Sequence, residues 1–140
     1  MSITQPATGA PAAKQRTGSR VLPIIAAVVG TVVVWLVAHS VLDVALKVKS
    51  GDTVQDVSIA SVIIVTLVVG LLAWALLAVL ERVTKAARTV WTTIGVVFFL
   101  LSLLGPLGAV GSSAKLSLAC MHLVAAAIII PGLGRTARRR

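Results

Sequence analysis

The sequence predicts an all-α fold, a four-helix transmembrane bundle with both termini on the cytoplasmic side (N-in/C-in). One observation is composition: the chain is 58% hydrophobic and only 12% charged, whereas a soluble domain of this size carries about 25% charged residues. The other is pattern: four apolar runs without Asp, Glu, Lys or Arg are separated by short polar segments. Each run is long enough to cross the roughly 30 Å hydrocarbon layer as a helix.

Three regions follow from this pattern. Residues 1–20 are polar and contain Pro and Gly, so a disordered basic tail is expected there. Residues 21–134 form the transmembrane domain, in which successive helices are antiparallel neighbours. Residues 135–140 form a polybasic tail. The predicted spans are residues 21–42, 57–80, 89–110 and 116–133.

Prolines and small residues mark the ends and the contact faces of these spans. Pro23 falls in the first predicted turn, where a missing N–H costs least. Pro106 is expected to kink or end the third span, and Pro131 to end the fourth. Thr66 and Gly70 stand four residues apart, a spacing that lets another helix approach closely.

The distribution of basic residues predicts the orientation. Ten Lys and Arg lie in the two tails and in the turn at residues 81–88, and three lie in the other two loops. Cytoplasmic loops carry the excess of Lys and Arg, so both termini are expected on the cytoplasmic side of a bacterial plasma membrane. Basic residues beside the cytoplasmic leaflet attract anionic lipid. The residues expected to do so are Arg82, Lys85, Arg88, Arg135, Arg138, Arg139 and Arg140.

The net charge of +9 also raises the question of nucleic acid. The basic residues flank the apolar runs instead of forming one face, so nucleic acid is not an expected partner. The expected partners are the lipid bilayer and, through small-residue faces, further copies of the chain or other membrane proteins.

Two histidines and one aspartate are the candidate site residues. His122 lies about 10 Å deep by helical rise, while His39 lies near the outer end of the first span, with Asp43 four residues later on the same helical face. If the first and fourth spans are neighbours, the three could form one polar cluster that relays protons, binds a cation, or holds a headgroup or quinone. The alternative is that His122 only hydrogen-bonds within the bundle while the other two face water.

Motifs of catalysis are absent from the sequence. It has no Ser-His-Asp, HExxH, GxSxG, P-loop or paired-carboxylate pattern, and the single Cys120 excludes a CxxC motif. An enzyme is therefore not expected, nor a resident cofactor or metal. Three function classes stay open: a non-enzymatic membrane component acting through protein or lipid partners, a small oligomeric transporter or ion-permeation unit, and a redox subunit whose histidines bind haem.

Several stretches carry a family resemblance. They are Leu80-Glu81-Arg82 with Arg88 and Trp91, Leu101 to Leu107 around Pro106, and Met121-His122-Leu123 followed by Ile130 to Leu133. These resemble a family of small four-span membrane proteins of high-GC Gram-positive bacteria, a domain of unknown function, over roughly residues 20 to 134. The resemblance implies a four-helix integral membrane domain and assigns no activity.

Overall fold

A computed structural model describes residues 12–137 of the chain. Four helices in this range are long and apolar enough to cross a membrane, and each overlaps one predicted span. The predicted all-α architecture with four helices of membrane length is therefore confirmed. The membrane-length helices are Gly18–Val41, Ile59–Val83, Ala87–Leu107 and Ser112–Thr136.

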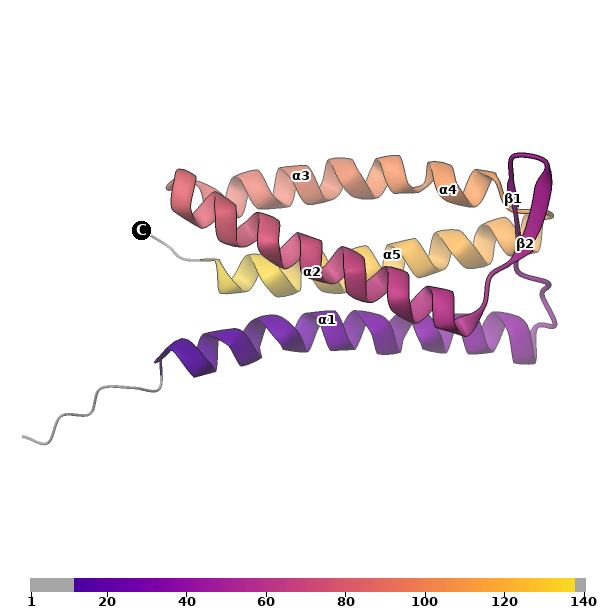
Figure 1. The fold of residues 1–140 in the computed structure, drawn as a ribbon, viewed down its shortest axis with the longest axis horizontal. Coiled ribbons are helices and arrows are strands. Elements are labelled where there is room, and N and C mark those ends of the chain that lie inside the picture. Colours follow the sequence, from indigo (N-terminus) through magenta and orange to yellow (C-terminus); the bar gives the residue numbers. More distant parts are fainter. Residues whose placement is uncertain (1–11, 138–140) are drawn as a thin grey trace, which may run out of the picture.

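The helices pack as a four-membered ring (Figure 1). α1 packs on α5 and α2, and α3 packs on the same two helices. A π-helical turn, η1, continues α1, and a one-turn helix, α4, follows α3. The bounds are α1 Ala12–Leu36, η1 Val37–Val41, α2 Ile59–Val83, α3 Ala87–Ser102, α4 Leu104–Leu107 and α5 Ser112–Thr136.

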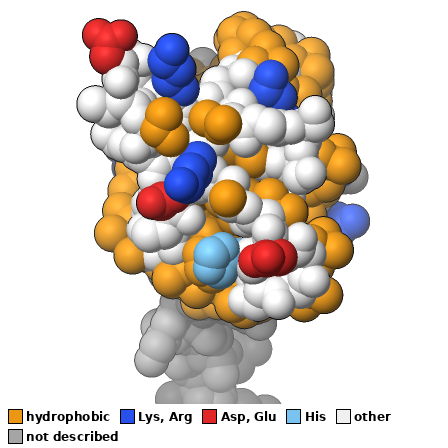
Figure 2. All heavy atoms as spheres, turned by 90° about the vertical axis from the view of Figure 1, so that its right-hand side faces the viewer, with side chains coloured by type: hydrophobic (Ala, Val, Ile, Leu, Met, Phe, Trp, Pro, Cys, Tyr) orange, Lys and Arg blue, Asp and Glu red, His pale blue; other side chains and the backbone are white. Residues whose placement is uncertain are grey.

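The two ends of the bundle differ in their residues and are called the basic end and the hairpin end. The basic end holds the α2–α3 turn at residues 84–86 and the end of α5 at Thr136. The hairpin end holds two short strands, β1 (Lys47–Ser50) and β2 (Thr53–Asp56). Figure 2 views the hairpin end, where Lys, acidic and His side chains lie among apolar ones.

The strands form a structure that the sequence analysis did not predict. They pair antiparallel across a turn in which Gly51 has φ +61°, a conformation that favours glycine. The other edge of β1 bonds to the α4–α5 loop: the Lys49 amide donates to the Gly108 carbonyl (3.0 Å), and the Val110 amide to the Lys47 carbonyl (2.9 Å). The α1–α2 and α4–α5 loops are thus joined through their backbones.

Three expectations for the first span are wrong. α1 already begins at Ala12, because alanine, lysine, glutamine and arginine are good helix formers and extend the membrane helix. Residues 12–20 are therefore not a disordered tail, while residues 1–11 lie outside the described part of the chain. Consequently Pro23 is inside α1 and not in its first turn. At the other end of this span, the helix stops before Asp43, which has φ +50° and so does not continue the helical face of His39.

The two remaining prolines behave differently. The break between α3 and α4 and the end of α4 at Leu107 confirm the expected effect of Pro106. Pro131, in contrast, does not end α5, which continues to Thr136. Neighbouring helices can compensate for a proline inside a membrane helix. The Trp91 indole N–H of α3 donates to the carbonyl of Ile130, 3.0 Å away, which fixes α3 against α5 beside that proline.

Close helix approaches occur at glycines. A Cβ added at Gly70 would lie 2.7 Å from Ile24 Cγ2 of α1, and one at Gly132 would lie 2.5 Å from Pro23 Cβ. Such distances leave no room for a side chain. The contact expected at Thr66 and Gly70 is therefore confirmed, and both residues are buried on α2.

Candidate functional site

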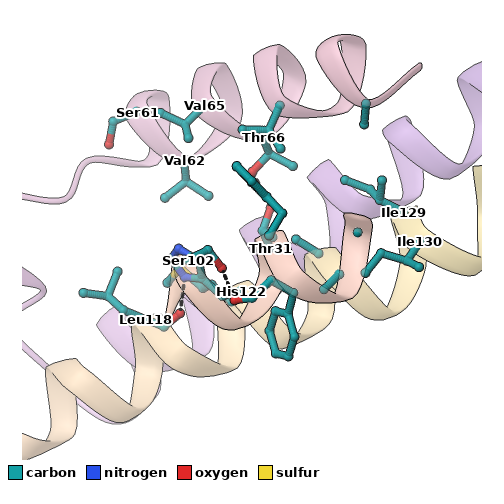
Figure 3. Close-up of a pocket in the computed structure, with 18 of the residues that line it drawn as sticks. Thr31, Ser61, Val62, Val65, Thr66, Ser102, Leu118, His122, Ile129 and Ile130 are labelled. Atoms are coloured by element: carbon teal, nitrogen blue, oxygen red, sulfur yellow. Dashed lines mark hydrogen bonds between the residues drawn. The ribbon is translucent and has the colours of Figure 1, made fainter. Parts of the chain in front are cut away.

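A cleft of about 380 Å³ lies between α2, α3 and α5, with one lining residue from α1. Its walls are mostly apolar. Valines come from α2, Phe98 and Phe99 from α3, and Ala125 and Ala126 from α5. The alanines leave the space that larger side chains would fill. Figure 3 shows the cleft, with Val62 and Thr66 reaching from α2 toward α5.

Five polar side chains line this cleft, and the hydroxyls of Ser61, Ser102 and Thr31 donate to backbone carbonyls. Ser102 donates to the Phe99 carbonyl (2.7 Å) and Ser61 to the Ser58 carbonyl (2.7 Å). Thr31 donates within α1, to the carbonyl of Ala27 or of Val28, 3.0 Å away in each case. Its hydroxyl oxygen also lies 3.4 Å from that of Thr66. The serine hydroxyls therefore keep only their acceptor lone pairs for a ligand.

His122 is the fifth polar side chain and comes from α5. Its Nδ1 lies 2.8 Å from the Leu118 carbonyl oxygen, which can only accept a hydrogen bond. In the neutral imidazole, Nδ1 therefore carries the proton and Nε2 is an acceptor. Within residues 12–137 no group is bonded to Nε2. The cleft thus combines apolar walls with acceptor atoms, an arrangement that suits an apolar molecule carrying a hydroxyl or N–H group.

His39 and Asp43 do not share this cleft. His39 is exposed in η1 and stacks on Trp35, with ring centroids 4.7 Å apart, while Asp43 is exposed beyond the helix. Neither is among the residues that line the cleft with His122. In the described part of the chain, no group of three His, Cys, Asp or Glu residues is arranged to hold a metal ion. The three predicted site residues thus lie in different surroundings.

A buried ion pair closes the basic end. Arg20 Nη2 of α1 donates to both carboxylate oxygens of Glu81 on α2, at 2.7 and 2.9 Å, and to the Thr136 carbonyl of α5 at 3.3 Å. Both side chains are about nine-tenths buried. The pair therefore ties three of the four long helices together.

The sequence analysis missed this pair, because it assigned Arg20 to a tail and Glu81 to a polar turn. One signal was present. Glu81 is the only acidic residue outside the first outer loop, since the other three acids are Asp43, Asp52 and Asp56. An isolated acidic residue at the end of an apolar run is a candidate for a buried ion pair.

With the geometry described, the chain can be compared with known proteins. Residues 11–139 match DUF6069, a family of unknown function. The chain belongs to this family. Neither curated proteins nor solved structures gave a match.

The DUF6069 match covers the stretches that carried the resemblance, and the structure gives three of their residues a place. Glu81 forms the buried ion pair, Pro106 is buried in α4, and His122 lines the cleft. Arg82 is exposed at the end of α2. The family match thus supports the predicted architecture, and the geometry has to supply the function.

The remaining basic residues of the predicted lipid-contact set lie at the same end of the bundle. Lys85 is in the α2–α3 turn, Arg88 is at the start of α3 and Arg135 at the end of α5, and all three are exposed. The prediction for residues 138–140 falls outside the described part of the chain. The basic end is therefore charged at its surface and ion-paired inside.

Proposed function

We propose that this protein is a non-enzymatic membrane component that binds a lipid carrying a hydroxyl or N–H group in the cleft between α2, α3 and α5. One observation carries the proposal: the cleft is apolar, and His122 and the two serines offer acceptor atoms to it. Its volume of about 380 Å³ lies within the range of small-molecule sites. The surrounding membrane supplies ligands of this chemistry.

The hydrogen bonds in the cleft also favour binding over catalysis. A serine nucleophile needs a base within hydrogen-bond reach. Ser102 and Ser61 instead donate to carbonyls of their own chain segments, and His122 is bonded to the Leu118 carbonyl. No described hydrogen bond joins a serine to the histidine. These groups hold a ligand more readily than they activate one.

The test uses hexadecanol and its methyl ether as probes, with the full chain purified in mild detergent. Retention of each probe is measured by native mass spectrometry. Ala126→Phe fills the cleft and should abolish retention of hexadecanol. Ala127→Phe is the matched control on the exposed face of the same helix and should not. His122→Phe removes one acceptor and should weaken hexadecanol about tenfold.

The methyl ether distinguishes hydrogen bonding to the cleft acceptors from simple partition of an apolar chain into the cleft. It has no donor, so it should bind more weakly to the wild type than the alcohol does and should be unaffected by His122→Phe. Equal retention of both probes by every variant would sink the proposal. If proton flux in liposomes disappears in His122→Ala, the chain is a permeation unit instead, and a visible absorption band in the purified protein would indicate a redox subunit.

The proposal includes an orientation, in which the basic end faces the cytoplasm of a bacterial cell. Its support is the concentration of Arg and Lys at that end. Thr53 lies in the exposed strand β2 at the opposite end, which makes it a suitable insertion site. A reporter that is active only outside the cell should be active there, whereas activity after Arg140 would reverse the orientation.

A further inference from the structure

A second groove lies between α3 and α5 at the basic end. Its volume is about 250 Å³, and it is lined by Arg88, Thr92, Ile130, Pro131, Gly134 and Arg135. Two of these are arginines from segments far apart in the sequence. Because α3 and α5 pack on one another, the fold brings both side chains to one groove. No acidic residue lines it.

The described residues supply no anion for these two arginines. Neither Arg88 nor Arg135 forms a salt bridge within residues 12–137. The acidic residue of this end, Glu81, holds the buried Arg20. The three aspartates lie in the loop at the opposite end of the bundle. Within the described residues the groove is therefore cationic and has no acidic partner of its own.

The other lining residues indicate which molecule fits. Thr92 donates its hydroxyl proton to the Arg88 carbonyl (2.9 Å), so the guanidinium groups are the principal donors. Guanidinium N–H groups match the oxygen geometry of phosphate, often two at a time. Ile130 and Pro131 add an apolar wall that continues along a membrane-length helix. A molecule with an anionic group joined to an apolar chain fits both the guanidinium groups and the apolar wall.

We propose that the groove formed by Arg88, Thr92, Ile130, Pro131, Gly134 and Arg135 binds the phosphate of one anionic phospholipid. A phosphate site at these two arginines is more specific than a general attraction of anionic lipid to every basic residue of this end. It does not depend on the cleft ligand, since the cleft opens on other residues of α3. The lipid would belong to the leaflet that the basic end faces.

The experiment measures phosphatidylglycerol bound to the full chain in mild detergent, again by native mass spectrometry. The wild type should retain one molecule. Arg88→Gln and Arg135→Gln should each weaken retention about tenfold, the cost of a lost charge-assisted hydrogen bond. Arg88→Lys keeps the charge but loses the planar pair of guanidinium donors, so it should also weaken lipid retention.

Matched controls come from the same end. Arg82→Gln and Lys85→Gln remove the same charge from exposed positions outside the groove, and retention should change less than about twofold. If they weaken retention as much as Arg88→Gln does, attraction is diffuse and the proposal fails. It also fails if inorganic phosphate displaces the lipid at equal concentration, because the apolar wall would then contribute nothing. Unchanged circular dichroism of each variant confirms folding.

Discussion

The basic end and the hairpin end of this bundle solve the same packing problem in opposite ways. At the basic end, Leu77 and Leu133 are fully buried and Trp91 is 3% exposed, and the Arg20–Glu81 pair lies among them. Toward the hairpin end, α2 and α3 diverge from their shared turn (Figure 1), and the cleft occupies the space. The basic end is closed by an ion pair and large buried side chains, whereas the core of the hairpin end, which includes Val62, Leu118 and Met121, borders the cleft.

The difference shows how a small bundle can keep a cleft open. The hairpin end is held by backbone bonds between its loops, through Lys47 and Lys49 of β1. These bonds add to a side-chain core that includes Leu46, Ala109 and Ala114. With both ends fixed, the middle of the bundle does not have to collapse onto its own apolar walls. Variants that loosen either end therefore test whether the cleft depends on both.

Breaking the ion pair should have the largest effect. Glu81→Gln leaves Arg20 buried without its carboxylate, which should lower the free energy of unfolding by about 3–5 kcal/mol. The measurement is SDS titration in mixed micelles. Arg82→Gln, the exposed neighbour, should change stability by less than about 0.5 kcal/mol. The combined change Arg20→Met with Glu81→Leu should recover most of the loss, and a loss under about 1 kcal/mol in Glu81→Gln would show that the pair is not important.

Filling the α1–α5 crossing should have the next largest effect. Gly132→Ala places a Cβ where Pro23 Cβ is 2.5 Å away, and overpacking of this kind costs about 1–3 kcal/mol. Gly105→Ala is the matched control, because its Cβ would meet nothing within 4 Å. SDS titration should give a lower free energy of unfolding for Gly132→Ala than for Gly105→Ala. Equal stability would mean that α1 and α5 can move apart at no cost, contrary to a rigid basic end.

A pair of tryptophans offers the finest comparison between the two ends. Trp91 donates to the Ile130 carbonyl at the basic end, and Trp35 to the Val57 carbonyl (2.7 Å) at the hairpin end. Trp91→Phe should cost about 0.5–1.5 kcal/mol, the usual net contribution of one hydrogen bond. Trp35→Phe should cost less, since Trp35 is only half-buried and stacks on exposed His39. The reverse order would show that the hairpin end is the more tightly packed one.

The sequence was sufficient to predict the four helices, and the reason is physical. Lipid forces an apolar run to satisfy its own backbone, so hydropathy alone predicts a helix. The Thr66–Gly70 contact followed from the same local chemistry. What failed depended on neighbours that are distant in the sequence. Pro131 stays helical inside the packed bundle, and the free edge of β1 bonds to residues 108–110 of the α4–α5 loop.

The site was predictable only in part. The depth of His122 suggested a functional position, and the structure places it in the cleft. His39 was grouped with it on the condition that the first and fourth spans are neighbours; α1 does pack on α5, but His39 lies exposed in η1 and outside the cleft lining. Asp43 was added on the assumption that the helix continues, but its φ of +50° ends that face. The Arg20–Glu81 pair spans 61 residues of sequence, and no local pattern records such a contact.

The central position of β1 has a consequence for synthesis. One edge of this strand pairs with β2, which follows at once in the chain, while the other pairs with residues near Ala109. A nascent chain that has just inserted α2 therefore presents an unpaired strand edge outside the lipid. That edge stays available until the last helical hairpin has been translated. We expect assembly to finish with this pairing, so the loops farthest from the termini are the last part of the molecule to become native.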